Sequence, residues 1–124
     1  AEGIKDSGVS VRLFDIAVSD RTEVIEAMLG AKGFLIGSST HDNDMLPNIA
    51  AFLELLKGMR SKGRVGASFG SYGWAGGATG EIEKVLKEGG VEIAAPAVSC
   101  KYVPNADDLK MCYEFGVNFA KKCL

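Results

Sequence analysis

Short apolar runs alternate with helix-like segments along the chain, and this alternation restricts the fold more than any other feature. Two such runs, Phe34–Gly37 and Arg64–Phe69, each precede a polar or glycine-rich loop and then a helix with one apolar face. Parallel strands joined by crossover helices produce this order. We therefore predict an α/β fold, in which a three-layer, doubly wound parallel sheet carries helices on both faces.

Periodicity places four visible strands and the helices between them. The two runs above are expected to be the central strands. Val9–Phe14 and Val91–Ala95 alternate apolar and polar side chains, which is typical of strands exposed on one face, so we expect them at the edges. The expected helices are Ala1–Ser7, the segments that follow Asp20, Leu46 and the loop Gly70–Gly80, and Ala106–Leu124.

A doubly wound domain normally has a central strand before its first helix, and no such strand precedes Ala1–Ser7. We expect residues 1–124 to form one domain that is incomplete at its N-terminus.

Composition excludes several functional classes. Charged residues make up 24% of the chain and the net charge is −2, which provides no basic surface for nucleic acid. No apolar run approaches the ~20 residues of a membrane span, and no signal peptide is visible. The single histidine, His41, cannot supply a multi-histidine metal site. Cys100, Cys112 and Cys123 form no C-x-x-C pair, which indicates a reducing, cytoplasmic compartment.

The loops after the two predicted central strands carry the candidate site. Ligands of open parallel sheets bind outside the carboxyl ends of the strands. The first loop, Gly37–Asp44, is rich in hydroxyl, amide and carboxylate groups, and the second, Phe69–Ala78, places the only tryptophan among several glycines. Aromatic faces for stacking and backbone groups for edge hydrogen bonds suit a planar, polar-edged heterocycle.

Each of these features also has a purely structural interpretation. Tyr72 and Trp74 can cap the core, the glycines can serve turns, and Asp42 and Asp44 can cap a helix. His41 can simply face solvent. Cys112 and Cys123 fall on the apolar stripe of the last helix, where we expect core residues.

Several motifs resemble the flavodoxin-like domain of A-type flavoproteins, the flavodiiron proteins, and the resemblance covers essentially the whole chain. These motifs are Leu13-Phe14-Asp15 with Ser19-Asp20, Gly37-Ser38-Ser39-Thr40-His41-Asp42-Asn43, Met45-Leu46-Pro47, and Phe69-Gly70-Ser71-Tyr72-Gly73-Trp74-Ala75-Gly76-Gly77. The resemblance implies an FMN cofactor at the strand ends and neither catalytic nor metal-binding residues in this chain. The implied flavin-lining residues are Ser38, Thr40, His41 and Asn43 on one side, and Ser71, Tyr72, Gly73, Trp74, Gly76 and Gly77 on the other.

The sequence departs from the family pattern in three places. Ser39 stands where proline is common, and Asp42 and Asp44 replace asparagine and glycine, which adds negative charge beside the flavin. No segment matches the phosphate-binding loop between the family's first strand and first helix. The FMN phosphate would then lack charge-assisted hydrogen bonds of ~1.5–3 kcal/mol each.

The resemblance also implies partners. The chain would relay single electrons to a diiron centre on a β-lactamase-like domain outside it, within an O2 or NO reductase. Rubredoxin or a flavin reductase would be the electron donor, and a homo-oligomer the working form.

The sequence is also compatible with two functions other than electron transfer. The chain could be a fragment that binds no flavin and self-associates through unpaired strand edges. It could also be a receiver-type signalling domain, with which Ser71 and Lys101 are compatible. A receiver needs an acceptor aspartate at the end of the central strand, and Gly37-Ser38-Ser39 occupies that place.

Overall fold

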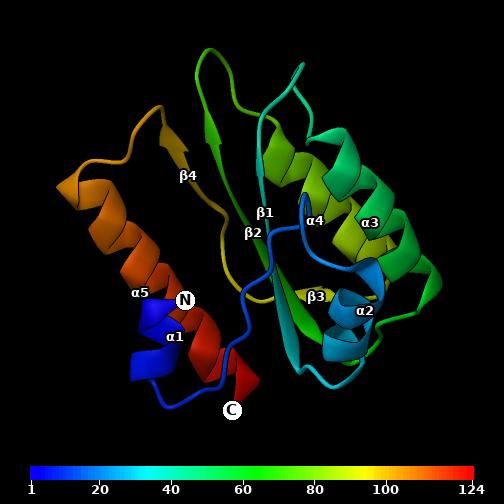
Figure 1. The fold of residues 1–124 in the computed structure, drawn as a ribbon. Helices are drawn as coiled ribbons and strands as arrows, with labels where there is room; N and C mark the ends of the chain where they lie inside the picture. Colours follow the sequence, from blue (N-terminus) through cyan, green and yellow to red (C-terminus); the bar gives the residue numbers. More distant parts are fainter.

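A parallel sheet lies between two layers of helices in the computed structural model, which describes residues 1–124 (Figure 1). One face is covered by α2, α3 and α4, and the other by α1 and α5. The predicted three-layer α/β architecture is therefore confirmed. The elements are α1 (Glu2–Asp6), α2 (Arg21–Leu29), β1 (Gly33–Ser39), α3 (Pro47–Gly58), β2 (Val65–Tyr72), α4 (Ala78–Glu88), β3 (Glu92–Ile93), β4 (Val98–Lys101) and α5 (Ala106–Cys123).

The central strand is β2, which pairs in parallel with β1 on one side and with β3 and then β4 on the other. The predicted edge strand Val91–Ala95 is thus reduced to β3, and its pairing resumes as β4. Pro96 lies in the gap, and proline has no N–H group to donate to a ladder. β3 and β4 together form one interrupted edge.

The predicted strand at Val9–Phe14 is wrong. No backbone N–H group from Ser10 to Phe14 donates a hydrogen bond within the chain. Val9 and Val11 pack on the α1 and α5 side of the sheet, whereas Phe14 packs on the opposite side. The alternation therefore reflects burial of a segment that passes from one face to the other. The sheet still has four strands, but their membership differs from the prediction, and β1, which was expected to be a central strand, lies at an edge.

Two apolar clusters hold the layers together. Between the sheet and α3 and α4, the side chains of Leu53, Leu56, Ile82 and Leu86 are fully buried. A smaller cluster on the other face includes Ala67, Phe119 and Ala120. The first half of β2 is buried between the two helix layers, whereas Phe69, near its carboxyl end, is 39% exposed.

Local sequence signals set the starts of α2, α3 and α5 as predicted, whereas α4 begins at Ala78, inside the predicted loop Gly70–Gly80. Asp20 accepts a hydrogen bond from Glu23 N at 3.1 Å at the start of α2, and Pro47 is the first residue of α3. Asn105 and Asp108 form a reciprocal capping box at the start of α5. Gly8, at φ +80°, follows α1 in the left-handed region that favours glycine.

The apolar stripe predicted along α5 is buried only in its second half. Gly116, Phe119 and Ala120 are buried, but Leu109 is 58% exposed and Cys112 is also exposed. The second half is covered by α1, which lies against it, while the first half packs against the short strand β4. The expectation that Cys112 is a core residue is therefore wrong. None of the helices is both long and apolar enough to cross a membrane.

Candidate functional site

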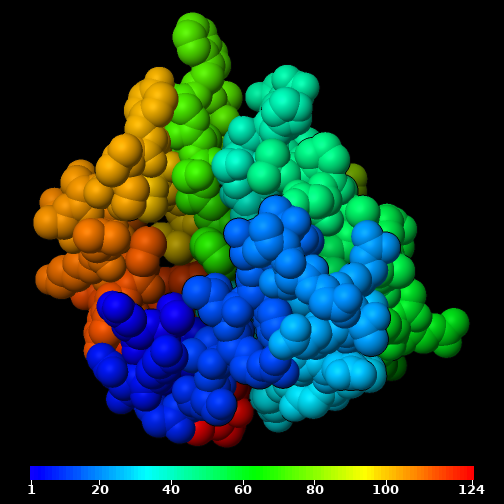
Figure 2. Space-filling view, in the orientation of Figure 1, coloured from blue at the N-terminus to red at the C-terminus, as the bar shows by residue number.

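The loops that follow β1 and β2 leave the sheet side by side. Ser39 is in register with Ser71 at the ends of the two strands, and Thr40 N donates to Ser71 O at 2.8 Å just beyond them. Figure 2 shows the loops after β1, β2 and β4 as separate projections at the same end of the molecule. This is the carboxyl end of the sheet, where the sequence predicted a ligand site.

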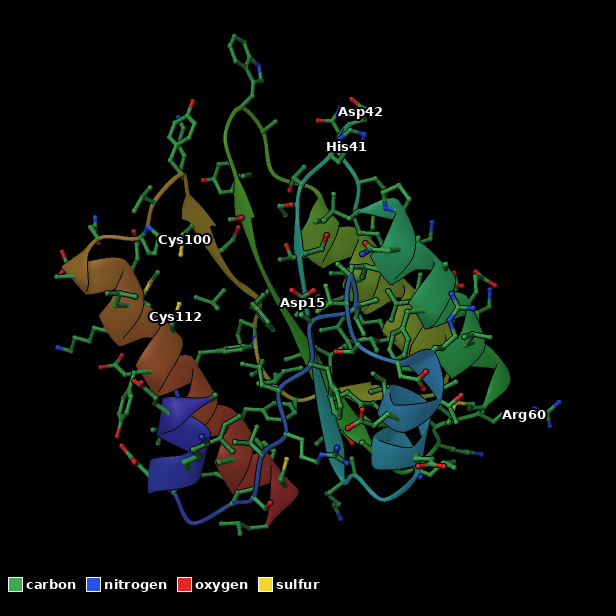
Figure 3. The ribbon with its side chains drawn as sticks, viewed as in Figure 1. Asp15, His41, Asp42, Arg60, Cys100 and Cys112 are labelled. Carbon is green, nitrogen blue, oxygen red and sulfur yellow. The ribbon has the colours of Figure 1, made fainter.

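The first loop turns sharply at Asp42 and Asn43. His41 and Asp44 exchange backbone hydrogen bonds of 2.8 and 2.9 Å, and the two residues between them have φ values of 49° and 63°. Positive φ at both central positions defines a type I′ turn, in which aspartate and asparagine are tolerated. At its tip, His41 Nε2 lies 3.4 Å from Asp42 Oδ2, and both side chains are exposed (Figure 3).

Two hydroxyl groups fasten this loop to neighbouring helices. Ser38 is buried, and its Oγ donates to Ser39 O at 2.7 Å and accepts from Leu46 N at 2.9 Å. Thr40 Oγ1 accepts from Ala78 N at the start of α4, at 3.3 Å. The only donor of the Ser38 hydroxyl is thus used inside the protein, whereas the Thr40 hydroxyl retains its donor.

Gly77 brings the second loop into contact with the first. A β-carbon at this position would meet the Asn43 carbonyl group, with the carbonyl carbon 2.7 Å away and the α-carbon 3.2 Å away. Only a residue without a side chain allows this approach. The close approach of the second loop to the first therefore depends on glycine at position 77.

The second loop presents unused hydrogen-bond donors. None of the backbone N–H groups from Gly73 to Gly77 donates a hydrogen bond within the chain. Trp74, in the same stretch, is 96% exposed. Backbone donors beside an exposed aromatic face are the groups that a flat ring with acceptor atoms along its edge requires.

A shallow cleft of about 240 Å³ lies between these two loops. Four of the predicted site residues line it, and the other six lie beside it on the same loops or strand ends. Asp42 and Ala75 also line the cleft although neither was predicted as a site residue. The lining residues are Thr40, Asp42, Asn43, Gly73, Trp74 and Ala75, and the adjacent predicted residues are Ser38, His41, Ser71, Tyr72, Gly76 and Gly77.

A third loop, after β4, contributes an aromatic residue that the sequence analysis missed. Tyr102 N donates to Tyr72 O at 2.8 Å, and the Tyr102 ring lies 3.1 Å from the position of a β-carbon built on Gly73. Tyr102 has φ 56°, and Lys101 Nζ is 5.7 Å from the centre of its ring. Its place directly after a strand was the signal that could have identified it.

Asp42 is the one charged residue among those that line the cleft. Asp42 and Asp44 belong to the first loop, and the Asp44 carboxylate accepts from Met45 N at 2.7 Å. Lys101 is the last residue of β4 and directly precedes the third loop. No group of three or more histidine, cysteine, aspartate or glutamate side chains is placed to hold a metal ion.

An open parallel α/β sheet with a cleft at the carboxyl ends of its strands is the arrangement of the doubly wound α/β domains, among which are the flavodoxin-like domains. Comparison with protein families agrees, because the flavodoxin family model matches residues 1–116. The chain belongs to the flavodoxin family. Flavodoxins bind FMN, and FMN is the cofactor of this domain.

Similar proteins point to one branch of this family. A nitric oxide reductase of Moorella thermoacetica is 43% identical over 98% of this chain and 31% of its own length. The rubredoxin oxygen:oxidoreductase of Desulfovibrio gigas superimposes with a TM-score of 0.94, at 29% identity, over 99% of this chain and 31% of its own. A flavodiiron core from Synechocystis gives a TM-score of 0.92 at 31% identity, over 99% of this chain and 30% of that one. The chain therefore spans about a third of the length of these proteins.

Proposed function

We propose that this chain is the FMN-binding electron-transfer domain of a flavodiiron-type oxidoreductase. In this proposal it relays single electrons to a diiron centre on a β-lactamase-like domain outside the chain. The observation that carries the proposal is the row of free N–H groups from Gly73 to Gly77 beside the exposed ring of Trp74. When bound, FMN supplies a ring that accepts and releases electrons one at a time.

The residues of the cleft have separable roles in holding that ring. Trp74 provides a stacking face, and the backbone of Gly73–Gly77 donates to acceptor atoms along the ring edge. Thr40 and Asn43 line the opposite wall, and Tyr72 and Ser71 lie where the second loop leaves β2.

The remaining predicted residues support this arrangement. Gly76 and Gly77 place no side chains at the end of the second loop, and Gly77 sets its approach to Asn43. Ser38 holds the first loop through Leu46 N. His41 stands at the loop tip, where it is placed to contact a ligand or a docking partner.

We further propose that the whole protein is an O2 or NO reductase. The support is that similar proteins carry the names nitric oxide reductase and rubredoxin oxygen:oxidoreductase, and that each is about three times as long as this chain. Rubredoxin or a flavin reductase is the proposed donor, a homo-oligomer the proposed working form, and the cytoplasm its proposed location. Trp74 is so exposed that it is available to a docking partner as well as to the flavin.

Flavin fluorescence titration with a matched pair of variants tests the FMN proposal. The Trp74→Ala variant removes an exposed aromatic residue in the cleft, and Leu13→Ala removes an 81% exposed apolar residue outside it. Stacking on an aromatic side chain is worth about 1–3 kcal/mol, so we expect Trp74→Ala to weaken FMN binding about 5- to 150-fold. Leu13→Ala is expected to bind as the wild type does.

The outcome distinguishes the proposed function from its alternative. Equal binding by both variants would remove Trp74 from the site. A well-folded wild-type chain that binds no FMN and sediments as a concentration-dependent oligomer would instead support the self-associating fragment. Circular dichroism of all three chains establishes that each is folded.

A further inference from the structure

Two cysteines on separate elements lie close together between β4 and α5. Cys100 is the third residue of β4, and Cys112 is on the second turn of α5. Figure 3 shows the two labelled side chains on facing sides of the space between strand and helix. The helix α5 packs against β4, and the Cys112 thiol is one of the causes of the raised pKa of Cys100, after the burial of Cys100 itself.

The two thiols differ in access to solvent. Cys100 is only 8% exposed, whereas Cys112 is exposed because the first half of α5 projects beyond the cover of α1. Burial is the largest cause of the raised pKa of Cys100, followed by the charges of Cys112 and Asp108. At neutral pH the Cys100 thiol is therefore protonated and shielded, and a reagent in solution reaches Cys112 first.

The third cysteine, Cys123, is too far from Cys112 to form a disulfide with it. Cys123 is on α5 with Cys112, eleven residues further on, which is about 16 Å along the helix axis at 1.5 Å per residue. A disulfide needs α-carbons within about 7 Å, so Cys123 cannot pair with Cys112. It is partly buried beside Gly33, and burial raises the pKa of its thiol.

We propose that Cys100 and Cys112 form a reversible intramolecular disulfide when the chain meets a low-molecular-weight disulfide. The Cys112 thiolate attacks one sulfur of the reagent RSSR, which forms a mixed disulfide and releases one RSH after protonation. The Cys100 thiol then loses its proton and attacks Cys112 Sγ, forming the Cys100–Cys112 bond and releasing a second RSH. Two protein thiols are oxidised and RSSR is reduced to two thiols.

This bond would stand next to the cleft. Cys100 is in register with Ser71 on β2 and directly precedes Lys101 and Tyr102. Tyr102 lies against Gly73 through the hydrogen bond from its N–H group to Tyr72 O. The disulfide would therefore link α5 to the end of β4, directly before the third loop begins. The formation of the bond depends only on the two thiols and does not require the proposed FMN function.

Thiol counting by mass spectrometry tests the proposal. The wild type and the Cys112→Ser, Cys100→Ala and Cys123→Ser variants are treated with oxidised glutathione, denatured and alkylated with iodoacetamide. The wild type is expected to retain one alkylatable cysteine, Cys123, and the Cys123→Ser variant none. Trypsin cuts after Lys101 and Lys110, so the disulfide joins two peptides that are otherwise separate.

The two variants that each lack one of the paired cysteines show the order of events. Cys100→Ala is expected to accumulate one glutathione on Cys112, and Cys112→Ser to keep Cys100 free and unmodified. Dithiothreitol must return the wild type to three alkylatable thiols. A wild-type chain that carries stable glutathione on Cys112 while Cys100 remains alkylatable, or that keeps all three thiols, would overturn the proposal. Because Cys112 is exposed, its replacement by serine leaves the fold intact, which circular dichroism verifies.

Discussion

Adding one methyl group at Gly77 is the most direct way to test how the two loops form the cleft. The β-carbon of Gly77→Ala would lie 2.7 Å from the Asn43 carbonyl carbon and 3.2 Å from its α-carbon. These are backbone atoms of a hydrogen-bonded turn, so they cannot rotate away. The φ of Gly77 is 168°, which lies outside the left-handed region that favours glycine, so the substitution chiefly tests the contact with Asn43.

Overpacking of this kind costs about 1–3 kcal/mol. We expect Gly77→Ala to lower the free energy of unfolding by that amount in urea denaturation. We also expect the displaced loops to weaken FMN binding at least tenfold, which corresponds to about 1.4 kcal/mol. Flavin fluorescence titration measures the second effect.

The Gly80→Ala variant is the matched control. Gly80 is on the same helix, three residues further on, and a β-carbon there would meet nothing within 4 Å. Alanine in a helix is more favourable than glycine, so Gly80→Ala should gain about 0.5–1 kcal/mol and bind FMN normally. If Gly77→Ala is as stable as the wild type and binds FMN equally well, close contact between the loops does not define the site.

Three further predictions concern the turn, the termini and the core. Asn43→Ala should lose about 1 kcal/mol of stability in urea denaturation because of its φ of 63°, whereas Asn43→Gly should not; equal losses would exclude a backbone cause. The Tyr113 hydroxyl donates to Asp6 Oδ2 at 2.8 Å and this bond raises the tyrosine pKa above 10.0, so its stabilising effect is present below that pH and is lost as the pH rises through the folded-state pKa. Urea denaturation across that range should show a smaller alkaline loss for Tyr113→Phe, and an equal loss would contradict the assignment. Ser61 Oγ is buried without a hydrogen-bond partner, so Ser61→Ala should raise the unfolding free energy by about 1 kcal/mol, and a lower value would indicate a partner for the hydroxyl.

Fold class and helix boundaries could be predicted because they depend on local signals. Pro47 at the start of α3, and Asn105 with Asp108 at the start of α5, identify helix ends wherever the chain goes next. The strand at Val9–Phe14 could not be judged in this way. Alternation of apolar and polar residues indicates which side chains are buried. A strand also needs a neighbouring strand with which to form hydrogen bonds, and this segment has none.

The candidate site was predictable to the extent that it follows from strand order. Loops after adjacent parallel strands must meet, which brings Thr40 and Asn43 to Gly73 and Trp74. Tyr102 was missed because its approach to Gly73 depends on where β4 resumes after Pro96. The engagement of Ser38 with Leu46 N depends on three-dimensional packing, which residue type alone does not reveal.

The most direct measurement of the central claim is a fluorescence titration of FMN with the 124-residue wild-type chain. The account predicts saturable quenching in the micromolar range or below, which corresponds to about −8 kcal/mol or better. It also predicts that Trp74→Ala shifts the midpoint to higher concentration by about 5- to 150-fold. A folded chain that leaves FMN fluorescence unchanged at all concentrations would contradict the claim that these two loops hold the flavin.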